Sequence, residues 1–165
     1  MRRFGVLIGS LLLTLLGGCF YHFSGGGLPP HVHTIAIVTF ENQTPSPDIP
    51  KELYEQMRRE LLQRLGVRDA PQNRADALVH GVIQSYDADV PVSFSANPQQ
   101  AVSAQRRLQL TIDVEILDQS NGRVIYANKA LRAEADYAER SEVEGRTRAI
   151  EKLVQSIVEG VQSHW

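Results

Sequence analysis

The chain has 165 residues, of which 17 are Lys or Arg and 19 are Asp or Glu, so its formal net charge is −2 at pH 7. This balance argues against a nucleic-acid-binding protein, because such binding depends on neutralising phosphates with basic side chains. Cys19 is the only cysteine, which excludes a fold held together by internal disulfides. The domain must therefore be stabilised by a hydrophobic core.

The N-terminal segment has the composition of a secretory signal peptide. Arg2 and Arg3 form a positive start, an apolar stretch runs from Val6 to Leu16, and small residues follow. The stretch is shorter than the roughly 20 apolar residues that a membrane-spanning helix needs. We therefore expect residues 1–18 to direct export and then to be removed.

The end of this segment, Leu16-Gly17-Gly18-Cys19, resembles a bacterial lipobox. The resemblance implies cleavage between Gly18 and Cys19 and a diacylglyceryl lipid on the Cys19 thiol. Two or more acyl chains give stable anchoring, since each buried CH₂ contributes about 0.8 kcal/mol. The covalent lipid is the only cofactor-like group that we expect. The alternative is an ordinary signal peptide followed by a chance cysteine.

Phe20 bears on the choice of membrane. An aspartate at the second mature position resembles the inner-membrane retention signal of enteric bacteria, and Phe20 stands there instead. We therefore expect a lipid-anchored protein on the periplasmic side of the outer membrane. Residues 19–30 contain three consecutive glycines and two prolines, as in a short tether. Residues 31–165 then have the size of a single domain.

The domain begins with a predicted strand and helix. Residues 34–40 are apolar and rich in β-branched side chains, as in a strand covered on both faces. A helix is predicted from Pro50 to Gly66, with a cap at Asp48. Its apolar stripe recurs every four residues, at Leu53, Met57, Leu61 and Leu65.

Two further strands are predicted in the middle of the chain. Residues 78–86 form an apolar run, whereas residues 87–105 give no clear pattern. Residues 108–116 alternate strictly between apolar and polar side chains, which predicts a strand with one buried face. The face expected to meet water carries Gln109, Thr111, Asp113 and Glu115.

A hairpin and a second helix complete the predicted domain. Asn121-Gly122 is a typical turn pair, and residues 123–133 return as a strand antiparallel to the preceding one. Ser141 and Glu144 resemble a capping box, and apolar residues at helical spacing follow from 143 to 161. The order β-α-β-β-β-α predicts an α+β two-layer sandwich, with two helices on one face of a mixed sheet of about four strands.

Few residues have the pattern of a catalytic or metal site. His31 and His33 could share one face of a strand, but two imidazoles without a third ligand are weak support for metal binding. His80 fits a core or edge position, and Asp87 with Asp89 fits a solvated strand end better than a pair of catalytic acids. We expect no catalytic residue, no metal and no enzyme activity.

Four basic residues flank the predicted hairpin. Arg106 and Arg107 open one strand, and Lys129 and Arg132 lie on the next, so antiparallel pairing could bring them near one another. Such a patch would suit the phosphates of a phosphorylated lipid. The alternative is that these charges only solubilise the ends of strands, as on most protein surfaces.

Several short motifs resemble one known family. They are Cys19-Phe20-Tyr21-His22-Phe23, Leu28-Pro29, the strand Thr34-Ile35-Ala36-Ile37 followed by Phe40-Glu41-Asn42, Ala75-Asp76-Ala77-Leu78, and the hairpin around Asn121-Gly122. Together they are similar to the lipopolysaccharide-assembly lipoproteins, the LptE-like proteins, and the likeness covers most of the mature chain. Phe20 departs from the family pattern, in which glycine usually follows the cysteine.

The resemblance implies a function. Members of the family are outer-membrane lipoproteins that sit inside a large β-barrel translocon and help it to assemble and to deliver lipopolysaccharide to the outer leaflet. The expected partners are therefore this barrel, lipopolysaccharide itself and the membrane that holds the anchor. An alternative is an outer-membrane lipoprotein that regulates a peptidoglycan synthase, which a long disordered tether would favour. The tether here is short.

Overall fold

The computed structural model describes residues 27–91, 105–138 and 140–163, so the predicted signal peptide, Cys19 and most of the predicted tether lie outside the described residues. Within these ranges the chain forms six strands and two helices. They are β1 (Thr34–Ile37), β2 (Glu41–Asn42), α2 (Ile49–Arg64), β3 (Arg68–Asp69), β4 (Ala77–Pro91), β5 (Gln105–Asp118), β6 (Val124–Ala138) and α3 (Glu142–Ser163).

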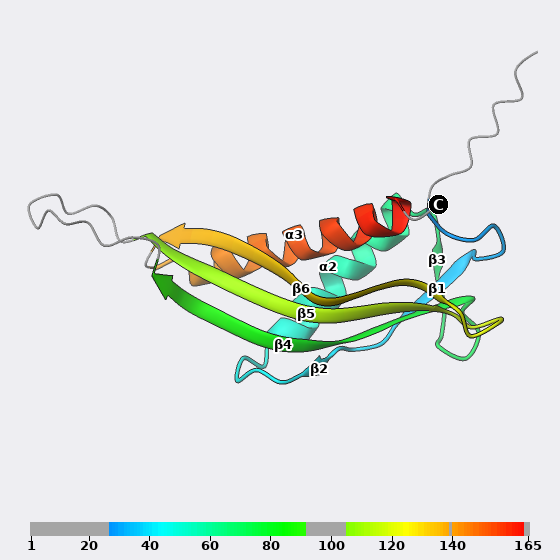
Figure 1. Cartoon of the computed structure of the whole chain (residues 1–165), viewed down its shortest axis with the longest axis horizontal. Helices are drawn as coiled ribbons and strands as arrows, with labels where there is room; N and C mark the ends of the chain where they lie inside the picture. Colours follow the sequence, from blue (N-terminus) through cyan, green and yellow to red (C-terminus); the bar gives the residue numbers. More distant parts are fainter. Residues whose placement is uncertain (1–26, 92–104, 139, 164–165) are drawn as a thin grey trace, which may run out of the picture.

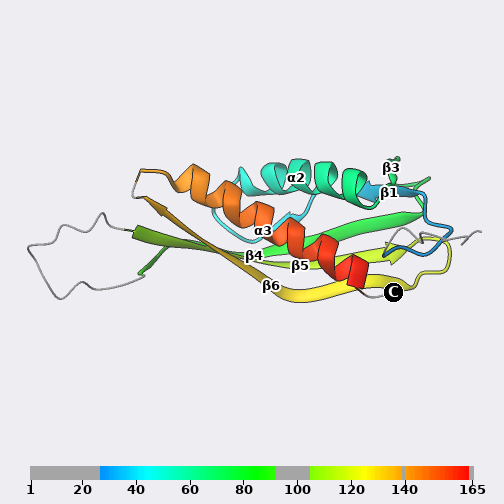
Figure 2. The same cartoon turned by 90° about the horizontal axis from the view of Figure 1, so that it is seen from above.

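The strands form one mixed sheet. Its order is β3-β1-β4-β5-β6, and β2 also pairs with β4. The short strands pair in parallel, whereas β4, β5 and β6 form an antiparallel meander. Both helices pack into the same core as one face of the sheet (Figures 1 and 2). The α+β class is confirmed, and the sheet has six strands instead of about four because β2 and β3, with two residues each, are too short to leave a sequence pattern.

The long strands extend further than their apolar patterns. β4 continues through Asp87 and Asp89 to Pro91, and β6 continues to Ala138. Beyond the bulge near Ser85, Asp87 and Asp89 are exposed, while Ala88 between them is half-buried. The Tyr137 hydroxyl donates a hydrogen bond to the Ala88 carbonyl and ties β6 to this extension. We call this end of the sheet the far end, and the end with the β5–β6 turn the turn end.

The helix boundaries agree with the sequence, but some of the expected cap interactions are not formed. Asp48 is the N-cap of α2 without a side-chain cap hydrogen bond, and Gly66 follows the helix with φ +67°. α3 begins directly after Ser141, at the predicted position. Val143 was expected in the apolar stripe of α3 and is instead 61% exposed, because it lies in the first turn on the side away from the sheet.

One hydrophobic core fills the space between the sheet and the two helices. The apolar residues of β5, from Leu108 to Ile116, are at most 3% exposed, which confirms the alternating pattern. A Cβ on Gly81 would lie 2.1 Å from the Asp113 carbonyl oxygen and 2.4 Å from the Phe40 ring, so glycine is required there. Thr111 was expected to meet water, and this prediction is wrong. It lies on the outer face of the sheet but is only 5% exposed, between its register partners Ser85 and Arg132.

Polar contacts fix the starts of the two helices to each other and to β4. Arg146 donates two hydrogen bonds, of 2.7 and 2.8 Å, to the Glu52 carboxylate, and these bonds raise the pKa of the guanidinium. The Tyr86 hydroxyl donates to Glu142 at 2.6 Å. None of the helices in the described ranges combines the length and apolarity needed to cross a membrane.

Candidate functional site

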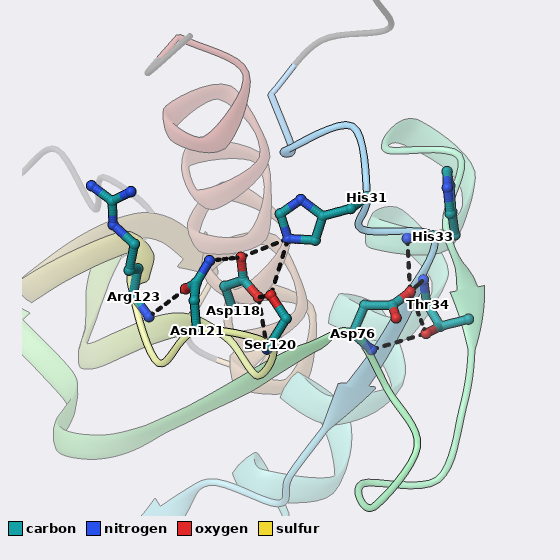
Figure 3. A network of polar contacts seen from close by, with 8 residues as sticks. All are labelled: His31, His33, Thr34, Asp76, Asp118, Ser120, Asn121 and Arg123. Carbon is teal, nitrogen blue, oxygen red and sulfur yellow. Dashed lines mark hydrogen bonds and ion pairs between the residues drawn. The ribbon is translucent and has the colours of Figure 1, made fainter.

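The first residues of the domain are bound to the loop before β4 by one carboxylate. Asp76 accepts hydrogen bonds from the backbone N–H groups of His33 and Thr34, both at 2.9 Å, and from the Thr34 hydroxyl at 2.8 Å (Figure 3). The Asp76 N–H in turn donates to the Thr34 Oγ1 at 2.9 Å. The hydrogen bond from His33, followed by that from the Thr34 hydroxyl, lowers the pKa of Asp76.

A second carboxylate holds the same segment to the β5–β6 turn. The Asp118 side chain is 3% exposed and accepts hydrogen bonds from the Ser120 hydroxyl at 2.6 Å, the Ser120 N–H at 2.9 Å and the Asn121 amide at 2.9 Å. His31 Nε2 lies 2.7 Å from Asp118 Oδ2, the oxygen that also accepts from the Asn121 amide (Figure 3). These contacts lower the pKa of Asp118 to about 2, and the hydrogen bond from the Ser120 hydroxyl has the largest effect. We call His31, Thr34, Asp76 and Asp118 the tether clamp.

His31 and Asp118 of the clamp lie beside Ser120, but the three residues are not in a catalytic arrangement. In a catalytic triad the two ring nitrogens of histidine face different partners, the nucleophile and the acid. Here His31 Nε2 faces both Asp118, at 2.7 Å, and Ser120, at 3.4 Å, and the Ser120 hydroxyl donates directly to Asp118. In this geometry the ring cannot accept a proton from the serine on one nitrogen while the acid orients it through the other. Its effect is to fix the chain entry.

The chain entry is also fixed by packing. Gly27 has φ +98°, and a Cβ there would lie 2.7 Å from both the Cα of Gln162 and the carbonyl oxygen of Val161. The first described residue therefore packs against the end of α3. Because the tether clamp holds the following residues, the point where the tether joins the domain is set at the turn end.

The histidines and acids considered as metal ligands do not converge. His31 forms a hydrogen bond with Asp118, whereas the His33 side chain points away from Asp118 in Figure 3. Across the described ranges, no group of three or more His, Cys, Asp or Glu side chains could hold a metal ion. Asp87 is an exposed strand residue and Asp89 is paired with Arg106, as a solvated strand end would be.

The four basic residues of the predicted patch separate into two pairs. Arg106 lies 2.8 Å from Asp89, and Arg107 lies 2.7 Å from Asp136 and 3.5 Å from Glu134. The Asp136 contact raises the pKa of Arg107. Both arginines are at the far end, and both already have carboxylate partners.

Lys129 and Arg132 lie in the middle of β6 and are exposed. Neither side chain forms a hydrogen bond or ion pair with another residue in the described part of the chain. Lys129 lines a hollow of about 180 Å³ on the outer face, together with His80, Asp113 and Glu115. The Nδ1 of His80 is buried there without a hydrogen-bond partner among the described residues.

The sequence did not identify the acids of the tether clamp. The turn sequence Asp118-Gln119-Ser120-Asn121-Gly122 does contain a signal, because an aspartate two residues before a serine commonly accepts hydrogen bonds within a turn. Asp76 has no comparable signal, since its partners lie 42 positions away at Thr34.

Comparison with known proteins identifies a family. Residues 32–161 match the model of the family LptE, described as lipopolysaccharide-assembly. This match covers most of the chain and almost the whole described domain. No curated protein matches the chain significantly.

Several solved structures are similar in fold. The hypothetical protein CT253 from Chlamydia trachomatis has a TM-score of 0.50 at 10% identity, covering 79% of this chain and 98% of that one. PelC from Paraburkholderia phytofirmans, solved as a dodecamer, has a TM-score of 0.49 at 18% identity, covering 80% and 93%. The lipoprotein GNA1162 from Neisseria meningitidis has a TM-score of 0.44 at 12% identity, covering 76% and 95%. At such identities a likeness concerns the fold alone.

The lowered pKa of Asp118 predicts how stability depends on pH. A carboxylate whose pKa is lower in the folded than in the unfolded state stabilises the fold above pH 4, and this contribution is lost as the pH falls from about 4 to about 2. Asp118→Asn removes the titrating group, so the free energy of unfolding should fall less steeply over this interval. Urea unfolding at a series of pH values measures the slope. Equal slopes for the two proteins would contradict the assignment, and Asp87→Asn, at an exposed strand position, is the control.

Proposed function

The chain belongs to the lipopolysaccharide-assembly family, and from this membership we propose that it is an outer-membrane lipoprotein that plugs a β-barrel lipopolysaccharide translocon and assists its assembly. The observation that carries the proposal is the family match over residues 32–161. In this role the protein is a structural partner of the barrel and not an enzyme.

The outer face of the sheet supports the plug role. Gln109, Asp113 and Glu115 lie half-buried on this face, with no helix covering them. The lumen of a large outer-membrane barrel is polar and holds water, so a domain seated in it needs a polar surface. The opposite face of the sheet is covered by the two helices and supplies the rigid core.

The tether clamp supports the proposed anchoring. Only eight positions separate Cys19 from Gly27, and the clamp fixes the following residues at the turn end. A lipid on Cys19 would therefore hold the turn end toward the membrane. The far end, where β4 ends at Pro91 and β5 begins at Gln105, lies at the opposite end of the sheet.

The partner prediction can be tested by affinity purification from detergent-solubilised membranes. We expect the full chain to recover a large outer-membrane barrel protein in stoichiometric amount, because the domain would be enclosed by it. Mass spectrometry of the eluate identifies the partner. Recovery of a peptidoglycan synthase in place of a barrel would overturn the proposal in favour of the regulator alternative.

The anchor prediction concerns Cys19 alone. Cys19→Ala removes the thiol that accepts the lipid, so incorporation of radiolabelled palmitate should be abolished. Ser24→Ala, in the same tether, is the control and should remain labelled. Continued labelling of the Cys19→Ala protein would refute lipidation at this site.

The basic residues predict where lipopolysaccharide is bound. Arg106 and Arg107 are neutralised by carboxylates, whereas Lys129 and Arg132 have no such partner among the described residues. Removing a charge-assisted hydrogen bond costs about 1.5–3 kcal/mol, or at least tenfold in affinity. We expect Lys129→Glu with Arg132→Glu to weaken lipopolysaccharide binding by this much or more.

The control variant is Arg106→Glu with Arg107→Glu. It reverses the same number of charges, but at the far end of the sheet. It should weaken binding less, because these arginines already have carboxylate partners. Binding is measured with purified protein and labelled lipopolysaccharide, and circular dichroism checks the fold. Unchanged binding in both double variants would leave only the scaffold role.

A further inference from the structure

We propose that the turn end carries a second membrane contact, a group of arginines that binds the headgroups of anionic phospholipids in the leaflet that holds the Cys19 lipid. The residues are Arg64, Arg68, Arg74 and Arg123, which we call the arginine collar. This inference rests on the lipid anchor of the proposed function, and it adds a binding surface on the folded domain.

Four different segments place the collar at one end of the molecule. Arg64 lies in the last turn of α2, and Arg68 lies in β3 with its N–H bonded to the His33 carbonyl at 3.0 Å. Arg74 lies in the loop before β4, and Arg123 directly follows the β5–β6 turn. These elements meet at the right-hand end of Figure 1, where α3 also ends.

Side-chain contacts hold these segments together. The Gln119 amide donates to the carbonyls of Gln72 and Ala75, at 2.9 and 2.8 Å, and so joins the β5–β6 turn to the loop that carries Arg74. The tether clamp joins both segments to the chain entry. In Figure 3 the Arg123 side chain extends away from this network and does not contact its carboxylates.

The collar is available to bind anions. All four arginines are exposed, and none of them forms an ion pair with another residue in the described ranges. The nearby acids have other partners: Asp69 lies 2.8 Å from Arg58 in an exposed ion pair, and Asp76 and Asp118 belong to the tether clamp.

The far end has a mixed charge character, because its arginines Arg106 and Arg107 are paired with Asp89, Glu134 and Asp136. It carries the exposed acids Asp87, Asp89, Glu134, Asp136, Glu142 and Glu144. The arginines without ion-pair partners in the collar are therefore a local feature of the turn end, in a chain whose formal net charge is −2. An anionic surface would attract the turn end more strongly than the far end, so the collar would orient the domain as well as hold it.

The length of the tether brings the collar to the membrane. The eight residues from Cys19 to Gly27 can span at most about 28 Å when fully extended. Electrostatic attraction between exposed charges acts over about 8 Å at physiological ionic strength. The tether therefore lets the collar come within this range of the membrane but does not by itself hold it there. Each basic residue at an anionic surface contributes about fivefold to partitioning.

Vesicle co-sedimentation tests the collar without the lipid anchor. The mature chain from residue 19 onward, carrying Cys19→Ala, is mixed with phosphatidylcholine vesicles with and without phosphatidylglycerol. We expect salt-sensitive binding only to the vesicles that contain phosphatidylglycerol. Arg68→Gln with Arg74→Gln should weaken this binding about 25-fold, from two residues at about fivefold each.

The matched control removes the same charge elsewhere. Lys51→Gln with Arg140→Gln changes two exposed basic residues at the starts of α2 and α3, away from the turn end, and should leave binding unchanged. Urea unfolding of each variant checks that the fold is intact. Equal loss of binding in both double variants, or no loss in the collar variant, would overturn the proposal.

A final comparison separates phospholipid from lipopolysaccharide. If the Arg68→Gln with Arg74→Gln protein loses binding to lipopolysaccharide but keeps binding to phosphatidylglycerol vesicles, the collar serves lipopolysaccharide and the proposal is wrong. The assay contains neither the anchor nor the barrel. Its failure is therefore distinguishable from failure of the lipidation or co-purification experiments.

Discussion

The fold depends on the position of β5 between two long antiparallel neighbours. Its apolar residues from Leu108 to Ile116 are almost completely buried, and burying a side chain of this size stabilises a protein by about 1.5–3 kcal/mol relative to leaving it exposed. A shift of one residue in pairing would turn all of them to the outer face. No surface ion pair, at about 0–1 kcal/mol, could compensate for that loss, so the hydrophobic pattern of β5 sets the register of the whole meander.

The register of β5 determines where the functional surfaces lie. Since alternate residues face opposite sides, burying Leu110 and Ile112 places Thr111 and Asp113 on the outer face, beside the hollow lined by Lys129. The same pairing ends at Asp118 and delivers its carboxylate to the turn end, where it meets His31. The polar outer face and the tether clamp are therefore consequences of one buried pattern. A single sheet connects the surface offered to a barrel with the point where the anchor enters.

The extent to which the sequence predicts this structure follows the range of the interactions. The alternation in β5, the turn at Asn121-Gly122 and the boundaries of both helices arise from neighbouring residues, and they are confirmed. β3 has two residues and exists only because β1 offers an edge at Thr34 and Ile35, so no local pattern marks it. The ion pairs of Arg106 and Arg107 likewise depend on which carboxylates lie across the strands, at Asp89 and Asp136. The prediction of a basic patch took the arginines into account but not these two carboxylates, which only the pairing of the strands brings close to them.

The tether clamp and the arginine collar occupy the same end for a physical reason. A lipid anchor restrains only the start of the tether, and a flexible tether would leave the domain free to rotate about it. The clamp removes this freedom between residue 27 and β1, and it uses the carboxylates of Asp76 and Asp118 to do so. Acids engaged in this way form no ion pair with the arginines around them. The contacts that fix the chain entry therefore also leave the turn end with unpaired positive charge, on the side of the domain that an anchor at Cys19 would hold against an anionic leaflet.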